Sequence, residues 1–134
     1  MIDIETELFS LIADKVQHEH PNAFITGEYV KAPPSLPCVF IIEADNLTHQ
    51  STITTSCGEN HAQLLYEVTV CSNKKRGKKE ECKSILKTVD DVLISLGFTR
   101  VVKNPIPNEL DATIYRIVAR YRAIVSKDKT IFRG

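Results

Sequence analysis

The chain has 134 residues, a mass of 15.1 kDa and a hydrophobic content of 43%. That is enough for one domain with its own core, and it excludes a fold that depends on metal or disulfide staples. Seventeen Lys and Arg balance seventeen Asp and Glu, so the formal net charge is zero. This neutrality argues against general nucleic-acid binding, which requires a cationic surplus, and it is an awkward value for a freely soluble monomer.

The first predicted elements are a helix and a short strand. Ile2–Gln17 has apolar residues at intervals of three and four, which is the stripe of an amphipathic helix. The stripe consists of Ile4, Leu8, Leu11, Ile12 and Val16. Asp3 suits the N-cap, and Pro21 stops the helix. Ala23–Val30 then predicts a short strand that ends before a proline-rich stretch.

The next two predicted strands flank a long polar segment. Cys38–Ile42 is apolar without alternation, which predicts a strand covered on both faces, either central in the sheet or partly in an interface. Leu64–Cys71 alternates between apolar and polar residues and predicts a strand with one buried face. Asp45–Asn60, between the two, is rich in Thr, Ser and Asn. It could be a hairpin extension or a mobile loop, and a loop of this length is often functional.

A second helix follows a basic turn at 73–79. Its apolar residues recur at intervals of one and three, so they form one stripe that packs on a sheet. They are Cys82, Ile85, Leu86, Val89, Val92, Leu93 and Leu96. Gly97 occupies the position where a helix ends in a left-handed residue. Thr99–Lys103 predicts a short strand, and Asn104–Asn108 predicts a rigid turn that contains two prolines.

The last major element is a strand over Asp111–Ser126. Its residues alternate for about fifteen positions, and at ~3.3 Å per residue it would span roughly 50 Å. Because strands are usually about 20 Å long, we expect it to bend, break or project beyond the body of the domain. Lys127–Lys129 would turn the chain back for a final strand at Thr130–Arg133.

The predicted order of elements is therefore α-β-β-β-α-β-β. This order indicates a single α+β domain at 1–134, in which two helices pack on one face of a mostly antiparallel sheet and a long strand or hairpin lies at the C-terminus. No internal repeat and no domain boundary is predicted.

No catalytic residue, cofactor site or metal site is predicted, so we do not expect an enzyme. His18 and His20 are two positions apart at a helix end, where their rings point in different directions and a solvated helix end is the simpler interpretation. Asp90 and Asp91 are neighbours on the polar side of the second helix and do not converge on a substrate. The five glycines are too few for a glycine-rich phosphate-binding loop.

The N-terminal residues and the cysteines indicate the cellular compartment and the redox state of the thiols. The first residues lack the cationic start and apolar run of a signal peptide, and no apolar run approaches the ~18 residues of a membrane helix. The cysteines, Cys38, Cys57, Cys71 and Cys82, form no C-x-x-C pair, so neither a zinc ribbon nor a redox motif is predicted. We expect reduced thiols that act as small core residues in a reducing cytoplasm.

Two basic features are the candidates for binding. The turn before the second helix carries Lys74, Lys75, Arg76, Lys78 and Lys79, and a solvated loop is the simpler interpretation of it. One face of the last long strand carries Ile114, Arg116, Val118, Arg120, Arg122 and Ile124. Arginine interleaved with aliphatic residues is typical of a protein interface. Two other interpretations of this face stay open, namely a solvated sheet face and a nucleic-acid-binding surface. Since the whole chain is neutral, we expect acidic areas elsewhere, at Glu5, Glu7 and Asp14 on the first helix and at Asp90 and Asp91 on the second. Segregated opposite charges suit a head-to-tail, ring-forming contact between copies.

Three segments of the chain, in order and over nearly its full length, resemble a known family. They are PCVFIIEADN, YEVTVCSNKKRGKKEECKSILKTVDDVLISLGFTR and PIPNELDATIYRIVARYRAIVSKDKTIFR. Together they are similar to the small tail terminator proteins of tailed bacteriophages and prophages, which complete the tail and join it to the head.

This resemblance implies a homohexameric ring at the head-proximal end of the virion tail, assembled in the cytoplasm of the bacterial host. The ring would cap the tail tube, stop its polymerisation and bind the head connector, while DNA would only pass through its lumen. It implies no catalytic residue, no cofactor and no membrane contact.

On this view Ile114, Arg116, Val118, Arg120 and Arg122 are candidates for the subunit interface. The candidates for contact with the tube or connector are Lys74, Lys75, Arg76, Lys78, Lys79, His49, Thr52, Ile53 and Thr54. The alternatives are another head–tail adaptor, a tail-tube-like protein, or a small bacterial domain that binds protein or nucleic acid.

Overall fold

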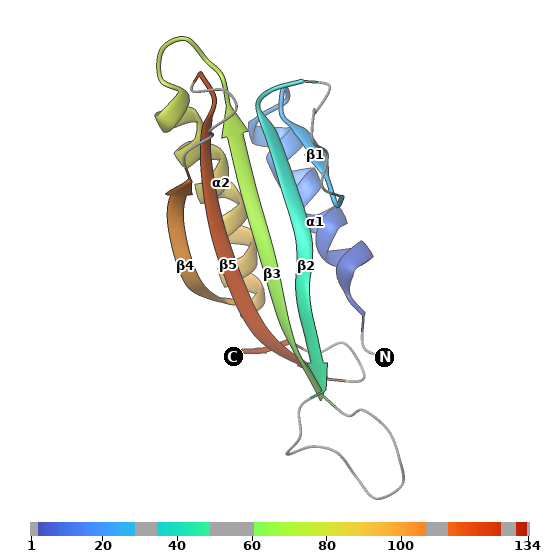
Figure 1. Ribbon diagram of the computed structural model, residues 1–134. Coiled ribbons are helices and arrows are strands. Elements are labelled where there is room, and N and C mark those ends of the chain that lie inside the picture. The colour runs from blue at the N-terminus through green and yellow to red at the C-terminus, as the bar shows by residue number, and fades with distance from the viewer. Residues whose placement is uncertain (1–2, 29–34, 49–60, 107–112, 127–130, 134) are drawn as a thin grey trace, which may run out of the picture.

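The computed structural model describes residues 3–28, 35–48, 61–106, 113–126 and 131–133, and Figure 1 shows how they are arranged. The predicted α+β class and the predicted order of elements are confirmed. In chain order the elements are α1 (Glu5–Glu19), β1 (Phe24–Thr26), β2 (Cys38–Thr48), β3 (His61–Ser72), α2 (Lys78–Leu96), β4 (Thr99–Ile106), β5 (Tyr115–Ser126) and β6 (Ile131–Arg133).

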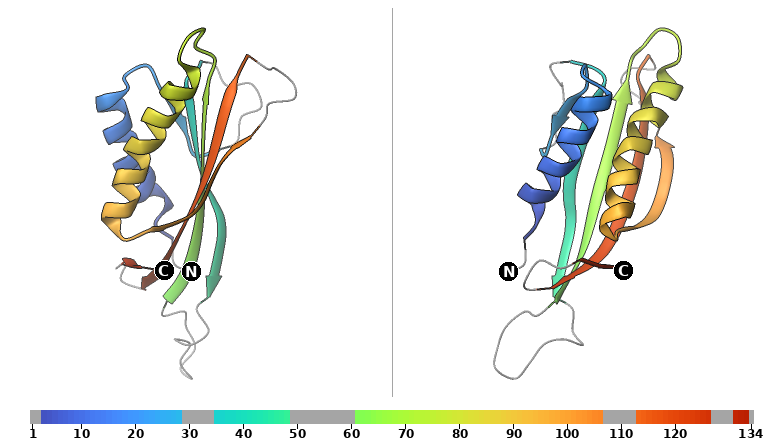
Figure 2. Two further views of the ribbon diagram at one scale, coloured as in Figure 1. Left: turned by 90° about the vertical axis from the view of Figure 1, so that its left-hand side faces the viewer. Right: turned by 180° about the vertical axis from the view of Figure 1, so that it is seen from behind.

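The strands form one sheet in the order β1-β2-β3-β5-β4. β1 runs parallel to β2, and all the other pairs are antiparallel. β6 pairs with the last part of β5, next to the stretch of β5 that pairs with β4. Both helices lie on the same face of the sheet, and in the described part of the chain no helix covers the other face (Figure 2).

The main core lies between the two helices and the sheet. The side chains of β3 and β5 that point toward the helices are those at every second position, as the alternation of the sequence predicts. The buried residues of this layer include Val39, Ile41, Leu64, Tyr66, Val68, Val70, Ile117, Ala119, Tyr121, Ala123 and Val125 from the sheet, and Leu8, Ile12, Val16, Ile85, Val89 and Leu93 from the helices.

α1 differs from its prediction at its start and in its buried stripe. The helix begins at Glu5 with Ile4 at the N-cap position, and Asp3 lies one residue further out, where its carboxylate accepts the Glu5 N–H at 2.9 Å. The buried residues are spaced by four, from Ile4 to Val16, whereas Leu11 is 50% exposed. Leu11 sits about 100° around the helix from the buried Ile12, so the prediction that it joins the core stripe is wrong.

α2 follows its prediction closely. Gly77 at the N-cap position and Gly97 at the C-cap position both have left-handed backbone, with φ of 82° and 107°. The Gly97 N–H donates to Ile94 O, and the Phe98 N–H donates to Leu93 O. A side chain at Gly97 would also meet Ile131 Cγ2 at 3.4 Å. Glycine therefore ends the helix and lets β6 lie close to it.

Three long strands form the centre of the sheet. Their lengths test the expectation that the last strand would bend, break or project beyond the domain. β5 has 12 residues, β3 has 12 and β2 has 11. β5 pairs with β3 along its whole length, and the three strands curve together in Figure 1. Of the three predicted outcomes, bending is the one observed: β5 curves with its neighbours, which are longer than the apolar runs suggested and match it.

The polar segment was predicted to be a hairpin extension or a mobile loop. Its two ends extend the hairpin, because β2 continues to Thr48 and β3 begins at His61. The remainder of that segment lies outside the described residues. β4 continues through Pro105, where a rigid turn was predicted. Proline is tolerated there because β4 is an edge strand, so the sheet does not need a hydrogen bond from an N–H at that position.

A smaller cluster lies on the face of the sheet that no helix covers. Cys38, Phe40 and Cys71 are buried there, at 0%, 1% and 4% exposed. Partly buried side chains pack against them, namely Phe24, Leu36, Ile42 and Ile114. Since Val39 and Ile41 are buried on the helix side, the prediction that the strand from Cys38 is covered on both faces is confirmed.

Two buried tyrosines on the helix side offer a matched test of this core. Both are 0% exposed. The Tyr121 hydroxyl donates to Asp90 Oδ1 at 2.7 Å, whereas the Tyr66 hydroxyl has no hydrogen-bond partner. Tyr121→Phe should lower the free energy of unfolding by about 1 kcal/mol, because it removes one of the two donors to Asp90 Oδ1 and leaves only the Arg100 guanidinium.

Tyr66→Phe is the control, since it removes a hydroxyl that is buried without a partner. It should change the free energy of unfolding by less than about 0.5 kcal/mol, or raise it. Urea denaturation of the two variants and the parent measures both values. Equal losses in the two variants would contradict the assignment.

Candidate interaction surfaces

The face of the sheet that no helix covers, called the open face below, carries the arginines predicted for an interface. Arg116, Arg120 and Arg122 alternate along β5 and point to this side together with Val118 and Ile124, because their neighbours in sequence lie in the helix-side core. The structure therefore brings the predicted set onto one face. Whether this face contacts another subunit stays a prediction.

The neighbours of these arginines follow from the strand register. Arg120 lies opposite Glu67 of β3, and its Nε and Nη2 atoms are each 3.1 Å from Glu67 Oε2. The Arg120 side chain is 50% exposed. Arg122 lies opposite Leu65. The end of the open face around Arg120 is thus both charged and accessible, as a partner-binding surface requires.

The other end of the open face is more closed. Val118 is 9% exposed, Ile114 packs against the Cys38–Phe40–Cys71 cluster, and the Nε atom of Arg116 is buried. Val118 and the Arg116 Nε atom are therefore shielded by their own chain, and Ile114 is partly buried. The alternation of the sequence could not show this, because the shielding comes from packing between segments far apart in the chain.

The basic turn lies at one end of the sheet, between β3 and α2. Lys74, Lys75, Arg76 and Lys79 are exposed, and Lys78 is half-buried and donates from Nζ to Thr113 O at 3.3 Å. The structure therefore leaves four of these five cations accessible to a partner.

The other residues predicted for contact with tube or connector, His49, Thr52, Ile53 and Thr54, lie outside the described residues. The residues that flank them can be placed. Thr48 ends β2 and His61 begins β3, so both lie at the opposite end of the β2–β3 hairpin from Ser72 and the basic turn (Figure 1).

The two sides of the sheet differ strongly in charge, although the chain is neutral. Residues 1–48, which form α1, β1 and β2, contain eight Asp and Glu against two Lys. Residues 61–134, which form all the other elements, contain fifteen Lys and Arg against eight Asp and Glu. Because β1 and β2 lie at one side of the sheet and β5 and β4 at the other, the domain is acidic at one edge and basic at the opposite edge.

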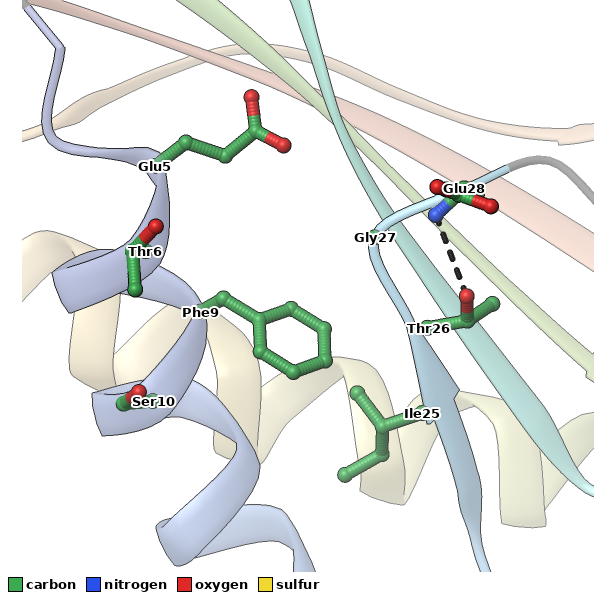
Figure 3. A pocket seen from close by; sticks show the side chains of 8 residues that line it. All are labelled: Glu5, Thr6, Phe9, Ser10, Ile25, Thr26, Gly27 and Glu28. Atoms are coloured by element: carbon green, nitrogen blue, oxygen red, sulfur yellow. Dashed lines mark hydrogen bonds between the residues drawn. The ribbon is translucent and has the colours of Figure 1, made fainter.

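The acidic edge contains a cavity of about 400 Å³ between α1 and β1, shown in Figure 3. Phe9 and Ile25 provide an apolar wall, and Glu5 and Glu28 provide charge. Glu5 also lies near Asp3 and Glu43, since carboxylate oxygens of the three lie within 4.8 Å of one another. Desolvation raises the pKa of Glu43, and the charges of Asp3 and Glu5 add to the shift.

The basic edge is formed by α2 and β4. Lys83 and Lys87 are one helical turn apart, and together with Arg100 and Lys103 they line a cavity of about 250 Å³. All four side chains are exposed. One acidic residue, Asp90, lines the same cavity, and it pairs with Arg100 at 3.0 Å.

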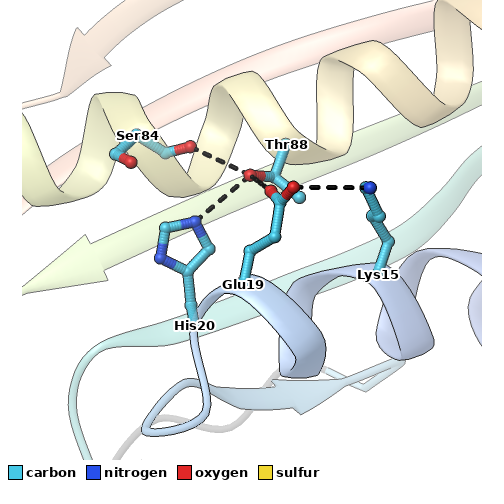
Figure 4. A network of polar contacts seen from close by, with 5 residues as sticks. All are labelled: Lys15, Glu19, His20, Ser84 and Thr88. Atoms are coloured by element: carbon cyan, nitrogen blue, oxygen red, sulfur yellow. Dashed lines mark hydrogen bonds and ion pairs between the residues drawn. The ribbon is translucent and has the colours of Figure 1, made fainter.

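The two histidines of α1 do not form a metal site in the structure. His20 Nε2 lies 3.1 Å from Thr88 Oγ1 of α2, and the Thr88 hydroxyl donates to Glu19 Oε2 at 2.7 Å (Figure 4). That hydrogen bond lowers the pKa of Glu19, with a further contribution from Lys15. The solvated helix end predicted for this stretch is confirmed at His18 and Glu19, which are exposed, whereas His20 is partly buried against Thr88 of α2.

The acidic areas predicted on the two helices agree with the structure only in part. Asp3 and Glu5 at the start of α1 lie near Glu43 of β2, which the sequence did not show. The acidic area predicted at Asp90 and Asp91 is corrected, because Lys83 and Lys87 on successive turns of α2 lie with Arg100 and Lys103 of β4, and Asp90 pairs with Arg100. A count of charges in the two parts of the sequence would have revealed the polarity, though not the edges.

No protein-family model matches the chain, and no curated protein matches it in sequence. A proposal for the function therefore rests on the surfaces described above. Neither helix of the described residues is long and apolar enough to cross a membrane.

Substitution of Arg120 tests whether the open face is surface or core. Arg120→Gln should lower the free energy of unfolding by less than about 1 kcal/mol, because half-exposed ion pairs contribute little. The double variant Arg120→Glu/Glu67→Arg restores an ion pair of opposite orientation and is the control. Circular dichroism and urea denaturation measure both, and a loss of several kcal/mol in Arg120→Gln would place this face in the core.

Proposed function

We propose that this chain is a structural protein of a tailed phage or prophage particle, of the tail terminator kind, with no catalytic role. Copies associate head to tail into a closed ring that caps the tail tube, stops its growth and joins the tail to the head connector. The observation that carries the proposal is the opposite charge of the two edges of the sheet.

Opposite charge on opposite edges favours association between copies. A surface that is complementary to a different surface of the same chain makes a heterologous contact, and such contacts close into rings when the rotation between copies allows it. Like edges repel one another, so the same charges disfavour the symmetric pairing of two acidic or two basic edges. The zero net charge of the chain then has a physical role, because the net charge of a ring does not grow as copies are added.

The cavity at the acidic edge has the chemistry to receive a cationic side chain of the next copy. Phe9 and Ile25 can contact the aliphatic stem of a lysine or arginine, and the Phe9 ring adds a cation–π contact. Glu5 and Glu28 lie beside the space that the charged group would occupy. Lys83 and Lys87 of the basic edge are the exposed cations that fit this role.

The ends of the sheet suit two further partners. The exposed cations of the basic turn lie at one end, and the last residue of β2 and the first of β3, Thr48 and His61, lie at the other. A protein that joins a tube to a connector needs two separate contact surfaces on opposite sides of its ring. The open face near Arg120 and Arg122 is a third surface, which we assign to contact between subunits together with the basic edge.

The alternatives predict different behaviour of the pure protein. A tail-tube-like protein would form long open polymers, because its heterologous contact does not close. A small binding domain would stay monomeric, and if its partner were DNA the affinity would fall steeply with salt. Native mass spectrometry distinguishes all three outcomes from a closed ring.

Two charge-reversal variants test the edges directly. Lys83→Glu/Lys87→Glu should make both edges acidic, and Glu5→Lys/Glu28→Lys should make both edges basic, so that neither variant assembles alone. Mixed together they should form a ring in which the two variants alternate in equal number, because each edge again meets its opposite. Native mass spectrometry reads the stoichiometry from the mass.

Lys74→Glu/Lys75→Glu is the matched control, since it makes the same change of charge in the basic turn, away from the edges. This variant should still form the ring but should join tails to heads less efficiently. A ring formed by either edge variant alone, or a mixture that stays monomeric under conditions where the parent assembles, would contradict the proposed contact.

A further inference from the structure

Two thiols and a guanidinium occupy one row of the open face. Cys38 of β2 lies directly opposite Cys71 of β3, and Cys71 lies directly opposite Arg116 of β5. All three side chains point away from the helices, because the residues on either side of each belong to the helix-side core or pack toward it. Sequence spacing does not reveal this row, since the two cysteines are far apart in the chain and form no C-x-x-C motif.

The two thiols are close enough to be joined. Residues directly opposite in an antiparallel pair have Cα atoms about 4.5–5.5 Å apart, and a disulfide spans about 4.4–6.8 Å between Cα atoms. Both residues belong to one buried cluster with Phe40, and both are free thiols. A disulfide between Cys38 and Cys71 therefore requires no change in the strand register.

The thiols differ in their protonation. A hydrogen bond from Cys38, and then the Arg116 guanidinium, lower the pKa of Cys71 below its ordinary value, although burial opposes this. The same thiol–thiol hydrogen bond and burial raise the pKa of Cys38, and Cys82 adds to the shift. Because Arg116 lies directly opposite Cys71 and Cys38 is one strand further away, the guanidinium stabilises a thiolate at Cys71, which we assign as the nucleophile of the pair.

Cys82 is an internal reference for these two. It lies on α2, on the other side of the sheet, and its thiol is 3.4 Å from Tyr115 O and 3.7 Å from Val70 O. Burial raises the pKa of Cys82 to about 12. A thiol that stays protonated and faces carbonyl oxygens is a poor nucleophile.

We propose that Cys71 and Cys38 form a site of reversible oxidative modification that takes a small peroxide as its oxidant. The Cys71 thiolate attacks one peroxide oxygen, the O–O bond breaks, and hydroxide leaves, so that Cys71 becomes a sulfenic acid. The Cys38 sulfur then attacks Cys71 Sγ, the S–O bond breaks, and the departing hydroxide leaves as water with the proton of Cys38. Two thiols are oxidised to one disulfide, and one hydrogen peroxide is reduced to two waters.

The disulfide stabilises the sheet. It links β2 to β3 at the end of the sheet next to the basic turn, which restricts the unfolded chain and raises the unfolding temperature. This inference stands on the register and the three side chains, and it does not rest on the proposed function.

The test uses the full chain with Cys57→Ser, because Cys57 lies outside the described residues and its thiol would complicate the mass. On treatment with hydrogen peroxide the folded protein should lose the mass of two hydrogen atoms, and peptide mapping should place the link between Cys38 and Cys71. Dithiothreitol should restore the mass. The oxidised form should unfold several degrees above the reduced form.

Three further variants, each checked for folding by circular dichroism, separate the roles. Cys82→Ser should oxidise at the parent rate. Cys38→Ser should stop at a sulfenic acid on Cys71, trapped by dimedone. Arg116→Gln should slow the oxidation about tenfold, because loss of the cation raises the thiol pKa. Arg116→Lys keeps the charge and should retain most of the rate, which excludes a purely structural effect.

The proposal is overturned by either of two results. One is a folded protein that stays reduced at a peroxide concentration that oxidises the urea-unfolded chain. The other is a disulfide that includes Cys82, or equal reactivity of Cys82 and Cys71.

Discussion

The pairing of β2, β3 and β5 along almost their full lengths is the constraint on which the rest of the structure depends. β3 lies between the other two and meets each in antiparallel register. Because side chains alternate between the faces of a strand, a slip of one residue in β5 would send its arginines into the core and its buried tyrosine and alanines to the open face. Burial of the helix-side layer therefore fixes the position of every side chain on the open face as well.

The one-sided cover of the sheet follows from the order of the elements. α1 precedes the sheet and α2 crosses from β3 to β4, and both lie against the same face. The helix side is then a closed core, while the open face is covered only in part, around Cys38 and Phe40. This arrangement leaves a charged, accessible region near Arg120, and it also places Arg116 beside two thiols. Both proposed sites depend on the same register.

The charged residues are segregated in space, although the net charge of the chain is zero. The N-terminal elements are acidic and the later elements are basic, and the sheet order keeps them on opposite sides. If β1 and β2 had been inserted between β5 and β4, the same sequence would have had mixed edges. Attraction between unlike edges of two copies is therefore a property of topology acting on a neutral composition.

Much of the fold was determined by the sequence. The spacing of apolar residues predicted both helices, Gly97 predicted the end of α2, and the alternation over β5 predicted which side chains share a face. Local sequence pattern failed where long-range packing decides, since Leu11 is exposed and Pro105 continues an edge strand. It left open whether the polar segment extends the hairpin, and the pairing of β2 with β3 decided this for the two ends of the segment. The acidic edge, the basic edge and the row of Cys38, Cys71 and Arg116 were decided by the tertiary structure alone. Each joins residues far apart in the chain, and only long-range strand pairing sets which of them become neighbours.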